Sequence, residues 1–156
     1  MLLVTGLGPA HLAGQAHAQL DQHEDYSMTP APSQRILVVD DDASIRRTLS
    51  ILLSRAGYEV IQASDGSEAL RLWRDRGGDL VITDLHMPEK DGIETIIELL
   101  SHTPGTSIIA MSGGGQTKRL DLLGNLALLG SVLTIEKPFT LAEMMAMVNR
   151  ALKPIH

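Results

Sequence analysis

Five polar residues stand at the C-terminal ends of four short, mostly apolar runs: Asp40 and Asp41, Asp84, Ser112, and Lys137. If these ends meet, three carboxylates repel one another unless a cation neutralises them. Mg²⁺ or Mn²⁺ prefers oxygen ligands, and such a site leaves positions for water and phosphate. A free carboxylate beside a metal, an ammonium and a hydroxyl suits phosphoryl transfer, with Asp84 as the nucleophile. The alternative for each acid alone is a helix cap.

The apolar runs have the character of strands that are buried on both faces. They lie at residues 36–39, 59–63, 81–84, 107–111 and 132–135, and helical patterns separate them. Since no tight hairpin signal joins them, the strands must pair in parallel through crossover connections. Right-handed crossovers then place all the strand ends at one edge. We predict an α/β fold, a doubly wound five-stranded parallel sheet of the flavodoxin-like type with strand order 2-1-3-4-5.

The helices are expected from apolar residues at three- and four-residue spacing. Asp42 can cap the first helix, a helix restarts near Gly92, and Thr140 with Glu143 forms a capping box before the last one. A Leu-rich helix is expected to end near Leu129, after the glycine-rich loop 113–119. The predicted core positions are Ile45, Leu49, Leu52, Leu53, Ala56, Ala69, Leu70, Trp73, Ile93, Ile96, Ile97, Leu100, Leu141, Met144, Met145, Val148 and Leu152.

Four segments in this order resemble the receiver domain of two-component response regulators. They are Ile36-Leu-Val-Val-Asp-Asp-Asp42, Thr83-Asp-Leu-His-Met-Pro88 with Asp91-Gly92, Met111-Ser-Gly113 and Lys137-Pro-Phe139. The similarity covers about Arg35 to Leu152, so we expect a receiver domain over residues 35–154.

The resemblance implies a role for each residue. Asp84 would be the phosphoacceptor and Lys137 and Ser112 would assist the transfer. Asp41 would bind the metal directly and Asp40 mostly through water. The backbone carbonyl of His86 would complete the protein ligands. A cis peptide bond is implied between Lys137 and Pro138, a form that is accessible to X-Pro bonds.

The family resemblance also implies the partners of the domain and its place in the cell. A sensor histidine kinase or a histidine phosphotransfer protein would supply the phosphoryl group, and a downstream protein target would read the signal. The domain would act in the cytoplasm, and no separate substrate turnover is expected, so it would not be an enzyme in the usual sense. Thr134 stands where the family usually has an aromatic switch residue, and we do not expect its small side chain to give the usual aromatic readout. The last two helices and the fifth strand would form the output surface.

Two other classes of function stay open. A Mg²⁺-dependent phosphohydrolase could also use an aspartyl nucleophile. Phosphohydrolases of the haloacid-dehalogenase type require a second aspartate two residues after the nucleophile, and this chain has His86 there. A binding module could keep the fold and act independently of phosphorylation.

The amino-acid composition of the chain argues against some classes of binding partner. The chain has 156 residues, a net charge of −6 and no cysteine. The negative charge argues against nucleic acid and anionic membrane surfaces, and no apolar run could span a bilayer. Residues 1–33 are expected to form a flexible extension, and Met28 is an alternative start. Since no output domain is expected after the last helix, a single-domain regulator is predicted.

Overall fold

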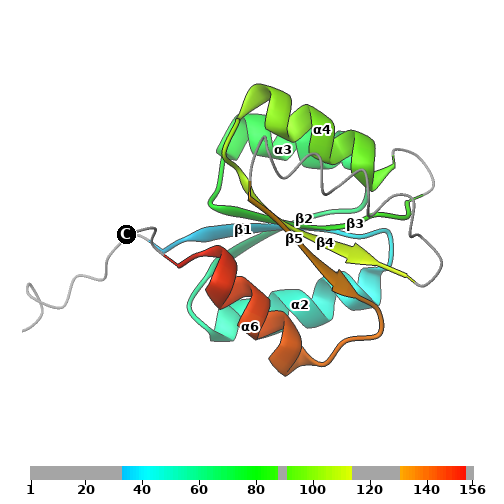
Figure 1. The fold of residues 1–156 in the computed structure, drawn as a ribbon. Coiled ribbons are helices and arrows are strands. Elements are labelled where there is room, and N and C mark those ends of the chain that lie inside the picture. The colour runs from blue at the N-terminus through cyan, green and yellow to red at the C-terminus, as the bar shows by residue number, and fades with distance from the viewer. Residues whose placement is uncertain (1–32, 88–90, 114–130, 154–156) are drawn as a thin grey trace, which may run out of the picture. The chain divides into compact units, whose positions relative to one another are not determined.

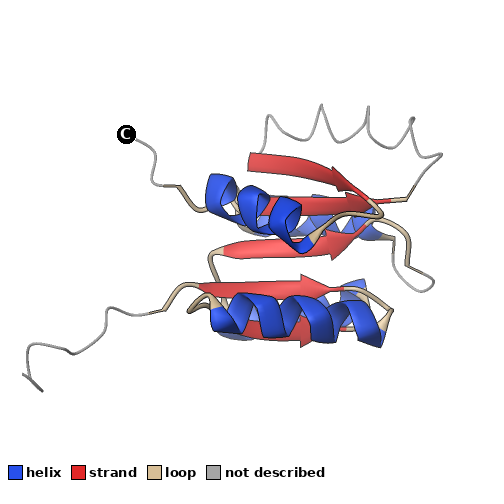
Figure 2. Ribbon diagram, turned by 90° about the horizontal axis from the view of Figure 1, so that it is seen from below, coloured by secondary structure: helices blue, strands red, loops and turns tan. Residues whose placement is uncertain are grey.

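Five parallel strands form one sheet in a computed structural model that describes residues 33–87, 91–113 and 131–153 (Figures 1 and 2). The spatial order is β2-β1-β3-β4-β5, as predicted. The strands are β1 (Arg35–Val39), β2 (Glu59–Ala63), β3 (Leu80–Asp84), β4 (Ser107–Ser112) and β5 (Ser131–Glu136). Every residue of the central strand β3 is buried, which explains its run of apolar and β-branched side chains.

Helices cover both faces of this sheet. Their bounds are α2 (Ala43–Arg55), α3 (Gly66–Arg76), α4 (Gly92–His102) and α6 (Leu141–Ala151). Figure 1 shows α3 and α4 on one face and α2 and α6 on the other. Each face has its own apolar core, because alternate residues of a strand point to opposite sides. Leu37 and Trp73 belong to the α3–α4 side, whereas Ile36 and Leu49 belong to the α2–α6 side.

Polar side chains begin the described helices by accepting hydrogen bonds from otherwise unpaired backbone N–H groups. Asp42 accepts from Ser44 in this way at the start of α2. The capping box predicted at α6 is confirmed, since Thr140 and Glu143 bond to each other's backbone N–H groups. Such a cap contributes about 1 kcal/mol of stability.

Three of the predicted core positions are wrong, because Ala56, Ile97 and Leu141 are exposed. Ala56 is the residue that caps the end of α2, so it lies past the last packed turn. Ile97 follows the fully buried Ile96, and a rotation of roughly 100° per residue carries it beyond the face that meets the sheet. Leu141 is the first residue of α6, and the buried residues of this helix, Met144 and Val148, lie one and two turns further along.

Some predictions fall outside the described residues. These are the Leu-rich helix ending near Leu129, most of the glycine-rich loop, and the flexible extension apart from its last residue, Ser33. Among the described helices, none combines the length and the hydropathy needed to cross a membrane.

Candidate functional site

The strand register brings the predicted polar residues to one edge of the sheet. Asp84, the last residue of β3, pairs with Met111 of β4. The next residue of β4 is Ser112, which pairs with the last residue of β5. Asp40 directly follows β1 and Lys137 directly follows β5. Four strands therefore deliver their polar residues to the same carboxyl edge, where open α/β sheets bind their ligands.

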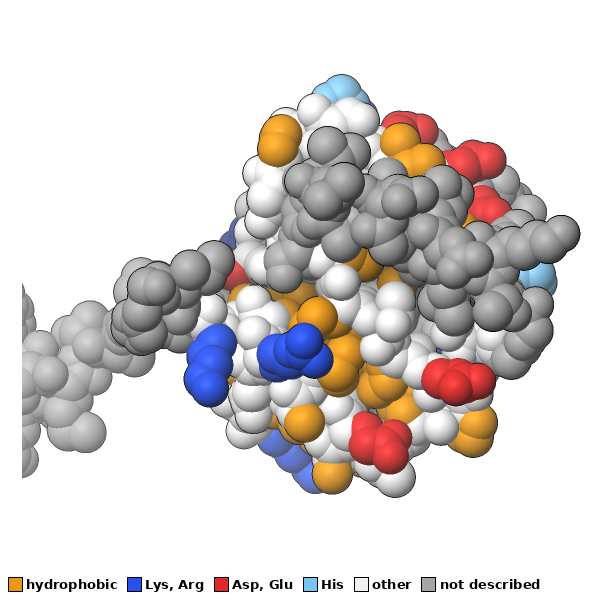
Figure 3. All heavy atoms as spheres, viewed as in Figure 1, with side chains coloured by type: hydrophobic (Ala, Val, Ile, Leu, Met, Phe, Trp, Pro, Cys, Tyr) orange, Lys and Arg blue, Asp and Glu red, His pale blue; other side chains and the backbone are white. Residues whose placement is uncertain are grey.

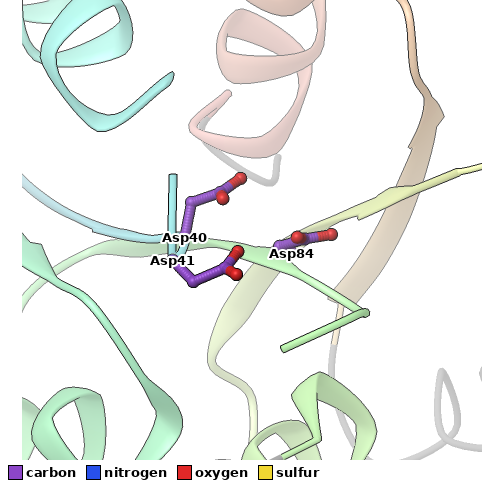
Figure 4. Close-up of side chains that lie close together, drawn as sticks. All are labelled: Asp40, Asp41 and Asp84. Atoms are coloured by element: carbon purple, nitrogen blue, oxygen red, sulfur yellow. The ribbon is translucent and has the colours of Figure 1, made fainter. Parts of the chain in front are cut away.

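Three carboxylates converge at this edge. One oxygen from each of Asp40, Asp41 and Asp84 lies within 4.8 Å of the other two (Figure 4). Asp40 and Asp84 are buried, whereas Asp41 is exposed. Three oxygen donors at this spacing fit a hard divalent cation, and the exposed side leaves room for water and phosphate oxygens.

Lys137 supplies a positive charge to two of these acids. Its Nζ donates to Asp40 Oδ2 at 3.0 Å and lies 3.4 Å from Asp84 Oδ2. Burial by itself lowers the pKa of Lys137, but its hydrogen bond and charge contacts with Asp40 and Asp84 outweigh burial and raise the pKa overall. The lysine is therefore an ammonium at neutral pH. The predicted cis peptide bond between Lys137 and Pro138 is confirmed.

Asp40 has hydrogen-bond partners for all of its polar groups. Its backbone N–H donates to Ala63, and its carbonyl accepts from Arg46 Nη1 at 2.7 Å. Its carboxylate accepts from the Asp42 N–H through Oδ1 at 2.9 Å and from Lys137 through Oδ2. Within the part of the chain that the structure describes, no residue donates a hydrogen bond to the Asp41 carboxylate. Asp41 is thus the better candidate for direct metal contact and Asp40 for contact through water.

Burial raises the pKa of Asp40 above its usual value near 3.8, more than its hydrogen bonds with Asp42 and Lys137 lower it. Because the folded pKa exceeds the unfolded one, the metal-free domain should lose stability as pH rises through the folded pKa. Asp40→Asn cannot ionise and escapes this loss. In EDTA, its melting temperature relative to the parent should therefore rise between about pH 4 and about pH 7. If the melting temperature of Asp40→Asn relative to the parent falls between these two pH values, the pKa of Asp40 is not raised in the folded domain.

Two further predicted residues are placed at the edge, but their roles stay predictions. Ser112 is 3% exposed, and its carbonyl accepts from the Lys137 N–H at 2.7 Å. Among the described residues, no hydrogen bond joins its hydroxyl to Asp84. The exposed His86 directs its backbone N–H at Asp84 Oδ1, 3.3 Å away. The metal contact expected of its carbonyl is not tested by this geometry.

Sequence reasoning missed two residues that support the site. Gly92, at the start of α4, lies so close to β3 that a Cβ there would be 2.1 Å from the carbonyl oxygen of Asp84. In the sequence, Gly92 stands out only as a helix start and as part of the Asp91-Gly92 segment, and neither indicates this close approach to β3. Arg46 contacts the Asp40 carbonyl. Its only signal was a basic residue in the first turns of a helix, where the macrodipole disfavours a cation.

An apolar groove opens beside Lys137. It has a volume of about 470 Å³ and lies between α2 and the start of α6. Its lining residues are Ser44, Ile45, Thr48, Leu49, Lys137, Pro138, Phe139 and Leu141. Figure 3 shows hydrophobic side chains reaching the surface in the half of the molecule where Figure 1 places α2 and α6. The groove and the acidic cluster meet at Lys137, which lines the groove and also contacts Asp40 and Asp84.

The profile of the response regulator receiver domain family matches residues 36–149. The chain belongs to this family, and it is a receiver domain of the kind found in two-component response regulators. Among curated proteins, the regulatory protein AtoC of Escherichia coli is 36% identical over 119 residues, which are 76% of this chain and 25% of AtoC. The chain spans about a quarter to a half of the length of the first curated relatives it matches.

Solved receiver structures agree with the fold. The chemotaxis response regulator CheY4 of Vibrio cholerae superposes with a TM-score of 0.68 at 30% identity, over 78% of this chain and 100% of that one. The response regulator TrrA of Thermotoga maritima, solved in complex with Mg²⁺-BeF, superposes with a TM-score of 0.66 at 33% identity, over 76% and 99% of the two chains.

Proposed function

We propose that this chain is a single-domain response regulator that accepts a phosphoryl group on Asp84 in a Mg²⁺-dependent reaction. The observation that supports this most strongly is the convergence of three carboxylates, with Lys137 bridging Asp40 and Asp84. The similarity to TrrA, which was solved with Mg²⁺-BeF, supports the same site in this chain. CheY4, which the chain covers in full, supports a regulator consisting of a receiver alone.

In the proposed reaction, an Asp84 carboxylate oxygen attacks the phosphorus of a phosphohistidine. The new P–O bond forms as the P–N bond breaks, and the histidine leaves with the electron pair of that bond. The Lys137 ammonium, 3.4 Å from Asp84 Oδ2, is placed to stabilise negative charge on the transferred group. The buried Ser112 is proposed to donate its hydroxyl to a phosphoryl oxygen. Attack by water later releases inorganic phosphate and restores the carboxylate.

The residues present fit a divalent ion, because their carboxylate oxygens are hard donors that lie within reach of one centre. Asp41 and Asp84 would hold it directly, Asp40 through water, and the carbonyl of His86 would add a further ligand. When bound, Mg²⁺ or Mn²⁺ would neutralise the acids and the phosphoryl oxygens.

The phosphodonor is proposed to be a sensor histidine kinase or a histidine phosphotransfer protein that docks in the groove between α2 and α6. A donor must bring its phosphohistidine to the carboxyl edge of the sheet, and this groove is apolar and shares Lys137 with the acidic cluster. The signal would then pass to a downstream protein target in the cytoplasm. No separate substrate is turned over in this scheme, and no contact with DNA is required of the domain itself.

The test is a phosphorylation assay on the full chain. With acetyl phosphate and Mg²⁺, intact-mass spectrometry should find one added phosphoryl group, which hydroxylamine removes as expected for an acyl phosphate. EDTA should abolish the addition and Mn²⁺ should restore it. Absence of the adduct with acetyl phosphate and with a phosphohistidine donor would contradict the proposal and favour a phosphorylation-independent binding module. Rapid, repeated hydrolysis of p-nitrophenyl phosphate would instead favour the phosphohydrolase.

A further inference from the structure

The turn that carries Asp41 is held at both of its ends. On the N-terminal side, Arg46 Nη1 donates to the Asp40 carbonyl at 2.7 Å. On the C-terminal side, the Asp42 N–H donates to Asp40 Oδ1 at 2.9 Å. The Asp40 carbonyl lies in the planar peptide group that joins Asp40 to Asp41, so fixing this oxygen also fixes the Asp41 nitrogen. The two bonds together set the direction in which the Asp41 side chain leaves the backbone.

Arg46 donates to this carbonyl from a position in α2 that is electrostatically unfavourable for a cation. It lies in the first turns of α2, near the positive end of the helix macrodipole, where a cation is disfavoured. Asp40 is fully buried, and leaving a buried carbonyl without a hydrogen-bond partner costs more free energy than keeping a cation at this position of a helix. The hydrogen bond therefore outweighs the unfavourable position of the charge. A short neutral residue at position 46 would suit the helix better but would leave the turn loose.

We propose that Arg46 is a positioning residue of the metal site, which directs the Asp41 carboxylate toward Asp84 by fixing the Asp40–Asp41 peptide group. This inference rests on the proposed function, because it requires that the three acids bind a divalent cation. Arg46 does not touch the cation or the phosphoryl group in this scheme. It acts through the backbone.

The charge of Arg46 and its hydrogen bond to the Asp40 carbonyl should affect Mg²⁺ affinity in opposite directions, so the two roles can be told apart by experiment. Removing a positive charge beside an acidic cluster strengthens the attraction of the cluster for Mg²⁺. Loosening the turn weakens binding, because a supporting contact around a metal ligand is typically worth about tenfold or more in affinity. If Arg46 acts only as a nearby charge, its removal tightens binding. If Arg46 positions Asp41, its removal weakens binding.

The experiment compares Mg²⁺ affinity in three proteins by calorimetric titration of the full chain. Arg46→Met removes both the charge and the hydrogen bond. Arg47→Met is the matched control, since the next residue of the same helix has the same charge and an exposed side chain. The rise in melting temperature caused by Mg²⁺ provides a second readout, and circular dichroism checks the fold. If Arg46→Met is unfolded at the assay temperature, Arg46→Ala replaces it, because alanine has no side-chain donor and has the highest helix propensity.

We expect the dissociation constant for Mg²⁺ to rise about tenfold in the Arg46 variant and to stay within about twofold of the parent in Arg47→Met. The Mg²⁺-induced rise in melting temperature should shrink in the Arg46 variant only. Equal or tighter binding by the Arg46 variant would overturn the positioning role, as would equal weakening in Arg47→Met. A parent chain that binds no Mg²⁺ would instead show that the proposed metal site itself is wrong.

Discussion

Asp84→Asn should accept no phosphoryl group while staying folded. The amide is a poor nucleophile, so we expect labelling by acetyl phosphate and Mg²⁺ to fall at least about 100-fold. Asp84 is 6% exposed and faces two other acids, but it also lies 3.4 Å from the Lys137 ammonium. Because these repulsive and attractive contacts oppose each other, loss of its charge should change the stability of the metal-free domain by less than about 1 kcal/mol. Intact-mass spectrometry measures the label, and thermal melting in EDTA measures stability.

The control for this variant is Asp75→Asn, which makes the same chemical change on the exposed surface of α3. It should be labelled as the parent is. If Asp84→Asn is labelled at the rate of the parent, the phosphoryl acceptor must be a residue other than Asp84. Loss of label in both variants would show that the assay reports something other than the carboxylate at the end of β3.

Gly92→Ala is expected to be the most destabilising single-methyl change near the site. The added Cβ would lie 2.1 Å from the carbonyl oxygen of Asp84 and 2.6 Å from the Cα of Leu85. These are backbone atoms, so no side-chain rotation can relieve the overlap, and α4 or the end of β3 has to move. We expect a loss of about 3 kcal/mol in the free energy of unfolding, measured by urea denaturation, and weaker Mg²⁺ binding.

Gly113→Ala is the matched control for this substitution. A Cβ at Gly113 meets nothing within 4 Å, so its effect on unfolding should stay below about 1 kcal/mol. If both alanine variants unfold at the same urea concentration as the parent, then α4 does not hold the end of β3 as closely as the structure indicates.

The strand order and the edge at which the site lies could be predicted from the sequence, because both follow from simple rules. Runs such as Ile36–Val39 are apolar throughout, and crossovers of one hand bring their carboxyl ends together. The spacing of apolar residues predicted the buried face of each helix less well at the edges of that face. Ile97 fits the spacing of a core position as well as Ile96 does, and only the packed helix shows which of the two faces the sheet.

Contacts inside the site could not be predicted in the same way. The sequence placed Lys137 near the acids, but the strand pairing and the rotamer decide that its shorter contact is with Asp40 rather than Asp84. The bond from Arg46 depends on the reach of one side chain back from the first turns of α2 to the strand end. The approach of Gly92 to Asp84 depends on how α4 enters the fold. No residue spacing encodes these distances.

The two neighbouring aspartates that follow β1 offer different opportunities to a protein engineer. The carboxylate of Asp40 accepts hydrogen bonds from the Asp42 N–H and from Lys137, so a replacement that lacks these acceptors leaves both donors without their partner. Asp41 is exposed, and no described residue donates a hydrogen bond to its carboxylate. Retuning the preference for one ion over another should therefore begin at Asp41, where ligand length and charge can be varied while the scaffold stays intact.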